Sequence, residues 1–276
     1  MKMPKTGTIL QLLGVILIVF LALFPLYWMF NVSLLPEAEV IKTHPHYYPL
    51  SSIITFKAYK DLIIGSSIFK FVLNSIIIVF LASLITLFLS FPIAYSIAKY
   101  NFKLKKYLQY GIIWLLALPW VVYVLPIFTI VSKLNLLDTH ILMIMLYGFS
   151  GIPLFSWFIL PFMYTFPSEL IDAGRLDGCS EWSIVVRIVI PALKNAFIAV
   201  FILRFVWAYN DLLYSLSFTF NKAKMIMPAI LEIPGYYEVP FAKMSAGGIL
   251  AVLPILLIVI IFQKYVVSGL TGRTLK

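Results

Sequence analysis

The stretch FVLNSIIIVFLASLITLFLSFPIAYSIA, residues 71–98, contains no charged side chain and determines the class of fold. A helix needs about 20 predominantly apolar residues to cross the hydrocarbon core of a bilayer. Inside that core every backbone N–H and C=O must be satisfied by the protein itself, and a helix does this along its whole length. The stretch therefore predicts a membrane-spanning α-helix.

The rest of the chain contains further apolar runs of similar length. The six predicted spans are Ile9–Phe30, Phe71–Ala98, Leu108–Val131, Ile141–Met163, Ala196–Leu213 and Ala246–Val267. The first run is longer than the apolar core of a secretory signal and has no obvious small-residue cleavage site, so we expect a retained anchor. The sequence thus predicts an all-α integral membrane protein with six transmembrane helices.

The composition supports this class. Of 276 residues, 62% are apolar and 12% are charged, whereas a soluble domain has about 45–50% apolar and about 25% charged residues. Such a balance excludes a soluble enzyme or binding module. The formal net charge of +10 does not require a nucleic-acid partner, because basic residues gather in the cytoplasmic loops of membrane proteins. Cys179 is the single cysteine, so an intrachain disulfide is excluded.

Basic residues also predict the orientation. Four lysines lie in the short connection after the second span: Lys99, Lys103, Lys105 and Lys106. Short loops rich in lysine stay cytoplasmic, so alternating spans place both the N- and C-termini in the cytoplasm of a multi-pass cell-membrane protein. In this single domain, 1–276, segments 31–70 and 217–243 are predicted extracytoplasmic loops, and 164–195 is a cytoplasmic loop.

The cytoplasmic loop 164–195 carries a distinctive pattern. Ser168 is placed as the N-cap of a short helix, and Gly178 suits the left-handed residue that ends it. A second helical run, Trp182–Ile190, is ended or kinked by Pro191. The pattern predicts helix, glycine turn and helix. From the pattern alone, an ordinary amphipathic connector at the membrane surface is an equally good interpretation.

The spacing within this loop is more specific. Asp172-Ala173-Gly174 is followed after three residues by Gly178, and after nine more by Ile188-Val189-Ile190-Pro191. This spacing resembles the signature loop of ATP-binding-cassette importer permeases, Glu-Ala-Ala-x3-Gly-x9-Ile-x-Leu-Pro. Asp replaces Glu, Gly replaces the second Ala, and Ile replaces Leu. These departures preserve charge, size or apolarity, and the flanking residues resemble the sugar-permease version of the loop.

Other segments extend the resemblance over nearly the whole chain. They are Asn74-Ser75 and Ala94–Ala98 at the two ends of the second span, Trp207–Asp211 in the fifth, and the tail Gln263–Thr271. The chain is therefore similar to the permease subunits of maltose-type, binding-protein-dependent carbohydrate transporters. That resemblance implies the type I importer permease fold.

In such importers two permease subunits form the pathway, and each offers the signature loop to an ATPase as a coupling helix. The resemblance assigns ATPase coupling to Glu169, Leu170, Asp172, Ala173, Gly174, Arg175, Asp177 and Gly178. The implied partners are a cytoplasmic ABC ATPase dimer, a second permease subunit of different sequence, an extracytoplasmic sugar-binding protein and membrane lipid.

This chain is not expected to be an enzyme. It lacks the Gly-x4-Gly-Lys-Ser/Thr phosphate loop, so we predict that it binds no cofactor and that ATP and Mg²⁺ are held by the partner ATPase. We predict no metal site, because His44 and His46 are interpreted as loop residues without further ligands nearby.

The fifth span supplies the candidate substrate-pathway residues. Sugars bind aromatic faces and hydrogen-bonding groups, which are present in Trp207, Tyr209, Asn210 and Asp211. The alternative is that these aromatic residues anchor the helix at the membrane interface. Arg204 is the fifth candidate, because burying it in a bilayer costs at least about 2.5–3.5 kcal/mol, and we expect it to face a polar cavity or a carboxylate. The sequence does not identify the sugar.

Two other functions fit six spans. A secondary transporter or channel is one, although acidic residues are missing from the span interiors apart from Asp211. A rhomboid-like intramembrane protease is the other, suggested by Gly148-Phe149-Ser150-Gly151. That chemistry needs a histidine base on a later span, and all three histidines, His140 being the last, precede Ser150.

Overall fold

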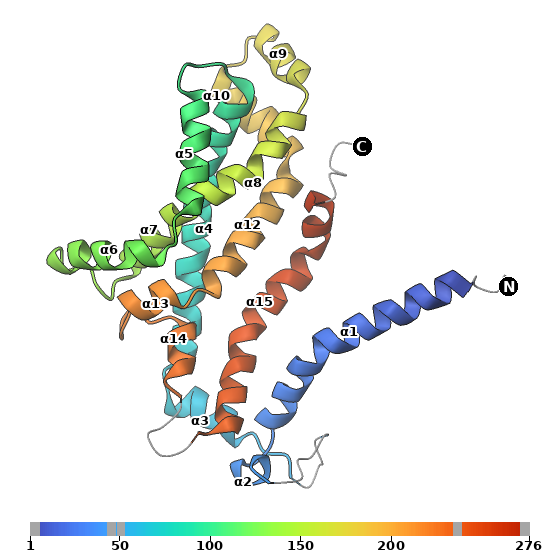
Figure 1. The fold of residues 1–276 in the computed structure, drawn as a ribbon, viewed down its shortest axis with the longest axis vertical. Coiled ribbons are helices and arrows are strands. Elements are labelled where there is room, and N and C mark those ends of the chain that lie inside the picture. The colour runs from blue at the N-terminus through green and yellow to red at the C-terminus, as the bar shows by residue number, and fades with distance from the viewer. Residues whose placement is uncertain (1–5, 43–47, 49–52, 234–238, 271–276) are drawn as a thin grey trace. The chain divides into compact units, whose positions relative to one another are not determined.

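The computed structural model describes residues 6–42, 48, 53–233 and 239–270, so His44 and His46 lie outside the described residues. Within these ranges every regular element is a helix (Figure 1). The elements are α1 (Thr6–Ser33), α2 (Glu37–Val40), α3 (Lys57–Gly65), α4 (Ile68–Lys99), α5 (Lys105–Ala117), α6 (Val121–Lys133), α7 (His140–Ser150), α8 (Ile152–Thr165), α9 (Ser168–Leu176), α10 (Glu181–Ile184), the π-helix η1 (Val185–Val189), α11 (Ile190–Ala192), α12 (Lys194–Tyr209), α13 (Leu213–Phe218), α14 (Ile226–Leu231) and α15 (Phe241–Leu270).

Three of the six predicted spans are single long helices, α1, α4 and α15. The other three are helix pairs, bent by 93° between α5 and α6, by 45° between α7 and α8, and by 79° between the run Glu181–Ala192 and α12. By length and composition, the described residues thus contain three helices that could cross a membrane, or six spans if each bent pair counts as one. The all-α prediction is confirmed.

The third predicted span, Leu108–Val131, is not one helix. α5 ends at Ala117, and Leu118 is extended, with φ −81° and ψ 125°. Leu118 precedes Pro119, and a proline ring disfavours helical backbone in the residue before it. The chain therefore turns sharply before α6 begins.

The fifth predicted span, Ala196–Leu213, is helical only as far as Tyr209. The Asp211 carboxylate accepts a hydrogen bond from the Tyr214 N–H at 3.0 Å, which satisfies a donor in the first turn of α13. A new short helix therefore starts where the sequence predicted the span to continue.

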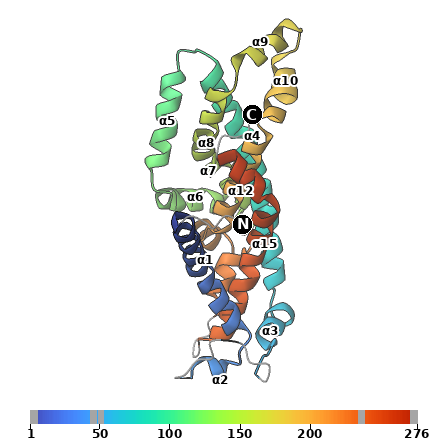
Figure 2. The ribbon, with the colours of Figure 1, turned by 90° about the vertical axis from the view of Figure 1, so that its right-hand side faces the viewer.

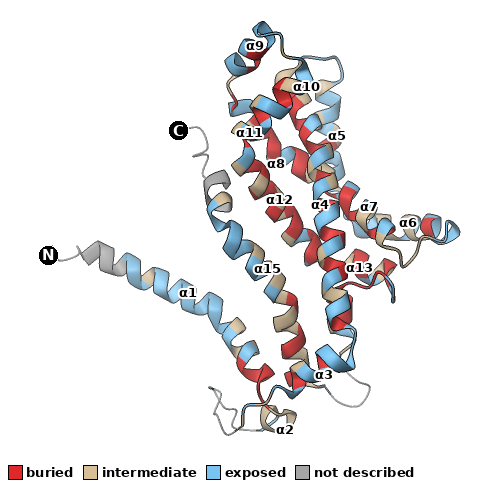
Figure 3. Ribbon diagram, turned by 180° about the vertical axis from the view of Figure 1, so that it is seen from behind, coloured by how far each residue is buried: buried red, intermediate tan, exposed pale blue. Residues whose placement is uncertain are grey.

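The chain divides into two compact units, one of Met1–Lys70 and Ala229–Leu253, the other of Phe71–Pro228 and Pro254–Lys276. In the first unit no side chain of α1 between residues 11 and 30 is buried, and Figure 3 shows most of this helix as exposed. The exposed side chains are almost all apolar, which suits a helix whose solvent is lipid.

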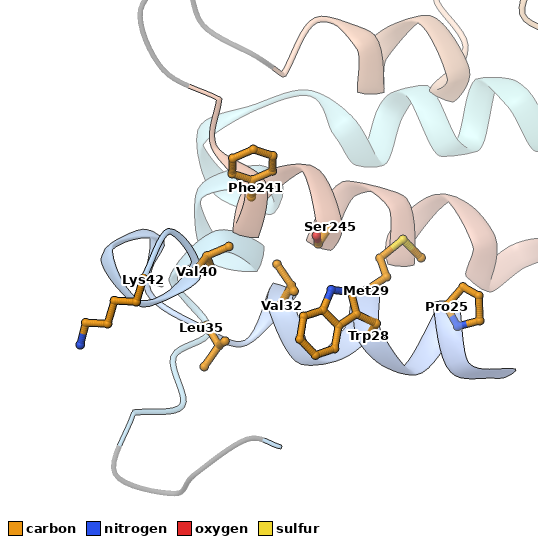
Figure 4. Close-up of a pocket in the computed structure, with 9 residues that line it drawn as sticks. All are labelled: Pro25, Trp28, Met29, Val32, Leu35, Val40, Lys42, Phe241 and Ser245. Carbon is orange, nitrogen blue, oxygen red and sulfur yellow. The ribbon is translucent and has the colours of Figure 1, made fainter. Parts of the chain in front are cut away.

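A polar contact and a cavity mark the end of α1 in this first unit. The Glu37 carboxylate accepts hydrogen bonds from the N–H groups of Ala242 at 2.9 Å and Lys243 at 3.3 Å, and so caps the start of α15. Beside it lies a cavity of about 440 Å³, shown in Figure 4. Its lining residues are Pro25, Trp28, Met29, Val32, Leu35, Val40, Lys42, Phe241 and Ser245.

The second unit contains the larger core. Its buried residues concentrate on α4, α8 and α12 (Figure 3). Phe91 of α4 packs edge-on against Phe197 of α12, with ring centroids 5.2 Å apart. The two views of Figures 1 and 2 both place α9 and α10 at the end of α4 from which the chain leads into α5.

Side chains of α4 satisfy backbone carbonyls at the break between α7 and α8. Pro153 lies at the start of α8 and has no N–H to continue the helical ladder. The Thr86 hydroxyl donates to the Gly148 carbonyl at 2.8 Å, and the Ser90 hydroxyl donates to the Ile152 carbonyl at 3.2 Å. Two side chains of α4 thus bind carbonyls that flank the break.

A second polar cluster orders the segment after α13. The Asp138 carboxylate accepts hydrogen bonds of 2.8–3.1 Å from four consecutive backbone N–H groups, those of residues 220–223. The Asn74 amide donates to the carbonyls of Lys222 and Lys224, both at 2.9 Å, and His140 lies 2.9 Å from the Asn74 oxygen. Asn74 therefore has a structural role in this chain.

Asp138 itself is electrostatically stabilised as a carboxylate. Partial burial raises its pKa, but the hydrogen bonds from the backbone of Lys222, Phe220, Ala223 and Asn221 outweigh that effect, so its pKa is lowered overall. Because the pKa is lower in the folded protein than in the unfolded chain, Asp138 contributes stability at neutral pH. That contribution disappears as the pH falls below about 4 and through the folded-state value.

We therefore expect Asp138→Asn to lower the free energy of unfolding by about 1–2 kcal/mol at neutral pH, because the neutral amide replaces a carboxylate that accepts charge-assisted hydrogen bonds. Thermal unfolding in detergent, compared between pH 7 and pH 3, measures this. The difference between variant and wild type should shrink at the lower pH. An equal difference at both values would contradict a role for the ionised group.

Candidate functional site

The signature loop folds as helix, glycine turn and helix, as the sequence predicts. Gly178 has φ +78°, its N–H donates to the Arg175 carbonyl, and the Cys179 N–H donates to the Gly174 carbonyl, both at 3.0 Å. These two bonds form a Schellman motif, which favours glycine at the left-handed position. Ser180 then caps α10 by accepting from the Ser183 N–H at 3.3 Å.

The predicted N-cap of α9 is wrong. Pro167 occupies the cap position without a side-chain hydrogen bond, and Ser168 is the first helical residue. The Ser168 hydroxyl instead lies 3.2 Å from Lys99 Nζ, which donates to it. The local pattern of a serine before an acidic residue could not reveal this partner in α4.

The inner face of α9 packs against the helix that follows the turn. Ile171 and Gly174 are its buried residues. A Cβ added to Gly174 would lie 2.9 Å from Ile188 Cδ1 and 3.2 Å from Ile184 Cγ1. Gly174 therefore brings two helices of this chain close together, so this member of the predicted coupling set faces inward.

The outer face of α9 is exposed. Leu176, 89% exposed, lies opposite the buried pair, and Leu170, 45% exposed, lies at the edge of the buried face. The other exposed members of the predicted set are Glu169, Asp172, Ala173, Arg175, Asp177 and Gly178. Leu176 lies within the predicted coupling helix but was not among the residues assigned to ATPase coupling, although an apolar residue two positions before the turn glycine was a usable signal. The result is a rigid short helix with apolar side chains among acidic ones.

The Glu181 carboxylate connects α9 to the end of α4. Its two oxygens accept from Arg175 Nε at 2.7 Å and from the Tyr100 hydroxyl at 2.6 Å. Arg175 also donates to Asp172 at 3.0 Å. The hydrogen bond with Glu181 raises the pKa of Arg175 and is the main cause of the raised pKa of Tyr100. Arg175 thus binds groups of its own chain.

Arg204 is buried, with 5% of its surface exposed. Its guanidinium donates to the Tyr147 carbonyl, to the Thr86 hydroxyl at 3.2 Å and to the Ser150 hydroxyl at 3.4 Å. A Cβ added to Gly151 would lie 2.5 Å from Arg204 Nε. The hydrogen bonds of Arg204 therefore go to a backbone carbonyl and hydroxyl groups beside the break between α7 and α8, not to a carboxylate.

Asp211 is linked to the same place through Tyr147. The Tyr147 hydroxyl donates to the Asp211 carboxylate at 2.8 Å, while the Tyr147 carbonyl accepts from Arg204. Tyr209 is buried, 1% exposed, and its ring stacks on Phe205 at 5.8 Å. The structure therefore brings Arg204 and Asp211 into one network that sequence spacing did not show.

The two remaining pathway candidates face outward. Trp207 is 47% exposed, and its ring packs edge-on against Phe155 at 6.4 Å. Asn210 is exposed, and its amide donates to the Val206 carbonyl at 2.8 Å. Residues three apart on a helix share a face, so Trp207 and Asn210 lie on one exposed side of the end of α12.

Ser150 does not have the surroundings of a catalytic serine. Its hydroxyl donates to the Tyr147 carbonyl at 3.3 Å and accepts from Arg204. His140, at the start of α7, is bonded to Asn74 instead. A serine protease needs a base beside its nucleophile, so these contacts argue against the protease alternative.

Comparison with protein families identifies the chain. The model of the family described as "binding-protein-dependent transport system inner membrane component" matches residues 87–272, more than half of the sequence. The chain belongs to this family. The resemblance to carbohydrate importer permeases is confirmed, and the protein is a multi-pass component of the cell membrane.

Relatives with known names span nearly the whole permease. The arabinooligosaccharides transport system permease protein of Bacillus subtilis is 30% identical over 91% of this chain and 89% of its own length. The trehalose transport system permease protein of Mycobacterium tuberculosis is 30% identical over 94% of each. The sulfoquinovosyl glycerol transport system permease protein of Agrobacterium fabrum is 28% identical over 98% of this chain and 95% of its own.

A solved structure shares the fold. It is the crystal structure of a bacterial ABC transporter involved in the import of the acidic polysaccharide alginate. The permease matches one of its chains with a TM-score of 0.77 over 96% of this sequence and 99% of that chain, at 17% identity. The predicted ABC importer permease fold is therefore confirmed.

The Arg204 network makes a prediction about stability. Arg204→Met should lower the free energy of unfolding of the permease by about 1–3 kcal/mol, because buried acceptors on Tyr147 and Thr86 lose their donor. Arg204→Lys should recover part of the loss, since an ammonium reaches fewer of these acceptors than a guanidinium. Thermal unfolding of the purified permease measures both, and a Met variant as stable as wild type would contradict this role.

Proposed function

We propose that this permease is a subunit of an ATP-driven sugar importer and forms half of its translocation pathway beside a second permease subunit of different sequence. Family membership supports a binding-protein-dependent transport system. The names of the relatives, which include arabinooligosaccharides and trehalose transport permeases, support a sugar as substrate. These findings favour an importer over a secondary transporter or channel.

The outer face of α9 is the proposed contact with the cytoplasmic ATPase. The observation that carries the proposal is the exposure of Leu176 opposite the buried pair Ile171 and Gly174, together with the exposure of Leu170 at the edge of that buried face. An amphipathic helix held in this way can insert its apolar side chains into a groove of a partner. Glu169, Asp172 and Asp177 would then set the register by charge.

The remaining partners follow from this arrangement. The sequence has no phosphate loop, so ATP and Mg²⁺ belong on the ATPase dimer, and this chain holds no cofactor. The predicted orientation places α9 in the cytoplasm and the segment 217–243 on the opposite side, where a sugar-loaded binding protein would dock.

Within the pathway, the exposed pair Trp207 and Asn210 is the best candidate for sugar contact. An indole face and a carboxamide on one side of α12 offer stacking and hydrogen bonding to a sugar. Arg204, Tyr209 and Asp211 would act behind them, because their side chains contact neighbouring groups of this chain. These three residues would fix the end of α12 on which the exposed pair lies.

The proposed transport step is mechanical. ATP binding closes the ATPase dimer, and the displacement of α9 passes into the attached helices, which exchange inward-facing and outward-facing states. The Schellman turn at Gly178 and the packing of Gly174 make α9 and the helix after it a rigid pair.

The test is recovery of partners from mild detergent. The tagged wild-type permease should recover a phosphate-loop ATPase and a second permease, identified by mass spectrometry. Leu176→Asp and Leu170→Asp should each weaken ATPase recovery at least about tenfold, because a leucine buried in a groove contributes about 1.5–3 kcal/mol. Recovery of the second permease should not change.

Leu104→Asp is the matched control, because Leu104 is 65% exposed at the start of α5, outside α9. This variant should recover the ATPase as wild type does. If the wild type never recovered an ATPase, or if both α9 variants recovered it fully, the proposed docking surface would be wrong.

A further inference from the structure

Both ends of α9 are attached to two consecutive residues, Lys99, which ends α4, and Tyr100, which follows it. At the start of α9, Lys99 Nζ donates to the Phe166 carbonyl at 2.6 Å and to the Ser168 hydroxyl at 3.2 Å. At the other end, the Tyr100 hydroxyl donates to Glu181, which also accepts from Arg175 of α9. The two attachments bracket the helix, so α9 cannot pivot about one contact.

This attachment is not a consequence of chain connectivity. Tyr100 and Glu181 are 81 residues apart in the sequence, and α5 to α9 lie between them. The covalent path from α9 leads instead through α10, η1 and α11 into α12, with a bend of 79° before α12 begins. α4 is in contrast one uninterrupted helix of 32 residues.

We propose that Tyr100 and Glu181 are positioning residues that transmit the displacement of α9 to α4. This inference rests on the proposed function, because it assumes that an ATPase moves α9. Glu181 is the shared element: one carboxylate oxygen binds Arg175 and the other binds Tyr100, so a movement of Arg175 displaces the partner of Tyr100 directly. Neither Tyr100 nor Glu181 belongs to the proposed docking face.

The attachment is more than an exposed ion pair. An isolated ion pair at the surface contributes little to stability, because solvent screens the charges and two long side chains must be ordered. Here the packing of Ile171 and Gly174 on the second helix sets the distance between Arg175 and Glu181. The Tyr100 ring is also placed by its neighbour, because it packs edge-on against Tyr95 of α4 with centroids 5.9 Å apart. The groups are therefore largely ordered before they bind.

The first measurement is hydrogen exchange on the full-length permease alone, which does not depend on the ATPase. Tyr100→Phe and Glu181→Gln should each raise the exchange rate of the α9 amides about threefold, toward the upper part of the range for partly exposed polar contacts, because the groups are held in place by packing. Tyr107→Phe is the matched control, because Tyr107 is 72% exposed on α5, and should leave the rate unchanged.

The second measurement is the ratio of sugar imported to ATP hydrolysed, in proteoliposomes that contain the assembled transporter and its binding protein. Both variants should recover the ATPase as wild type does and keep their basal ATP hydrolysis, yet import several times less sugar per ATP. A purely structural defect would lower import and hydrolysis together. The effects of the two changes in the double variant should be less than additive, since both act on the same hydrogen bond.

Unchanged exchange of α9 in both variants would overturn the attachment, while the proposed docking function could still stand. Raised exchange with a wild-type ratio of import to hydrolysis would overturn the transmission role. Loss of ATPase recovery in either variant would also overturn it, because the two residues would then belong to the docking surface. Failure of the wild type to recover any ATPase would instead overturn the proposed function on which the inference rests.

Discussion

A bilayer offers no hydrogen bonds to an exposed backbone, and the broken helices of this permease are arranged around that constraint. Where α7 gives way to α8, the carbonyls of Tyr147, Gly148 and Ile152 are bound by Arg204, Thr86 and Ser90. Where α12 ends, Asp211 binds the first turn of α13. Both of these breaks have polar side chains beside them, so these two bends are fixed features of the fold and can hold side chains in place.

Several polar residues of the second unit each bind more than one group, so a small number of them satisfies the polar groups beside the helix breaks. Tyr147 uses its carbonyl for Arg204 and its hydroxyl for Asp211. Asn74 bridges His140 and the carbonyls after α13, and Asp138 orders four backbone N–H groups of the same segment. Charged groups that sequence inspection would assign to a transport route are here partly structural. Under the proposed function, the exposed Trp207 and Asn210 would be the groups available to a substrate.

Part of the fold and of the candidate site could be predicted from the sequence, and part could not. The long apolar runs predicted the helices, and the spacing from Asp172 to Pro191 predicted the glycine turn, because both signals are local and periodic. Pro119 was a usable signal for the break after α5, but a hydropathy window averages over it. The partners of Arg204 and Ser168, and the bond between Glu181 and Tyr100, could not be predicted, since these groups lie far apart in the sequence and follow no periodic pattern.

The central claim is that the outer face of α9 meets an ATPase. The most direct measurement places a photo-crosslinking amino acid at Leu176, the most exposed apolar side chain of α9, in cells that express the permease with its own partners. After illumination, the account predicts one dominant adduct with a phosphate-loop ATPase, identified by mass spectrometry. Adducts with lipid or with a second copy of this chain, and none with an ATPase, would contradict it.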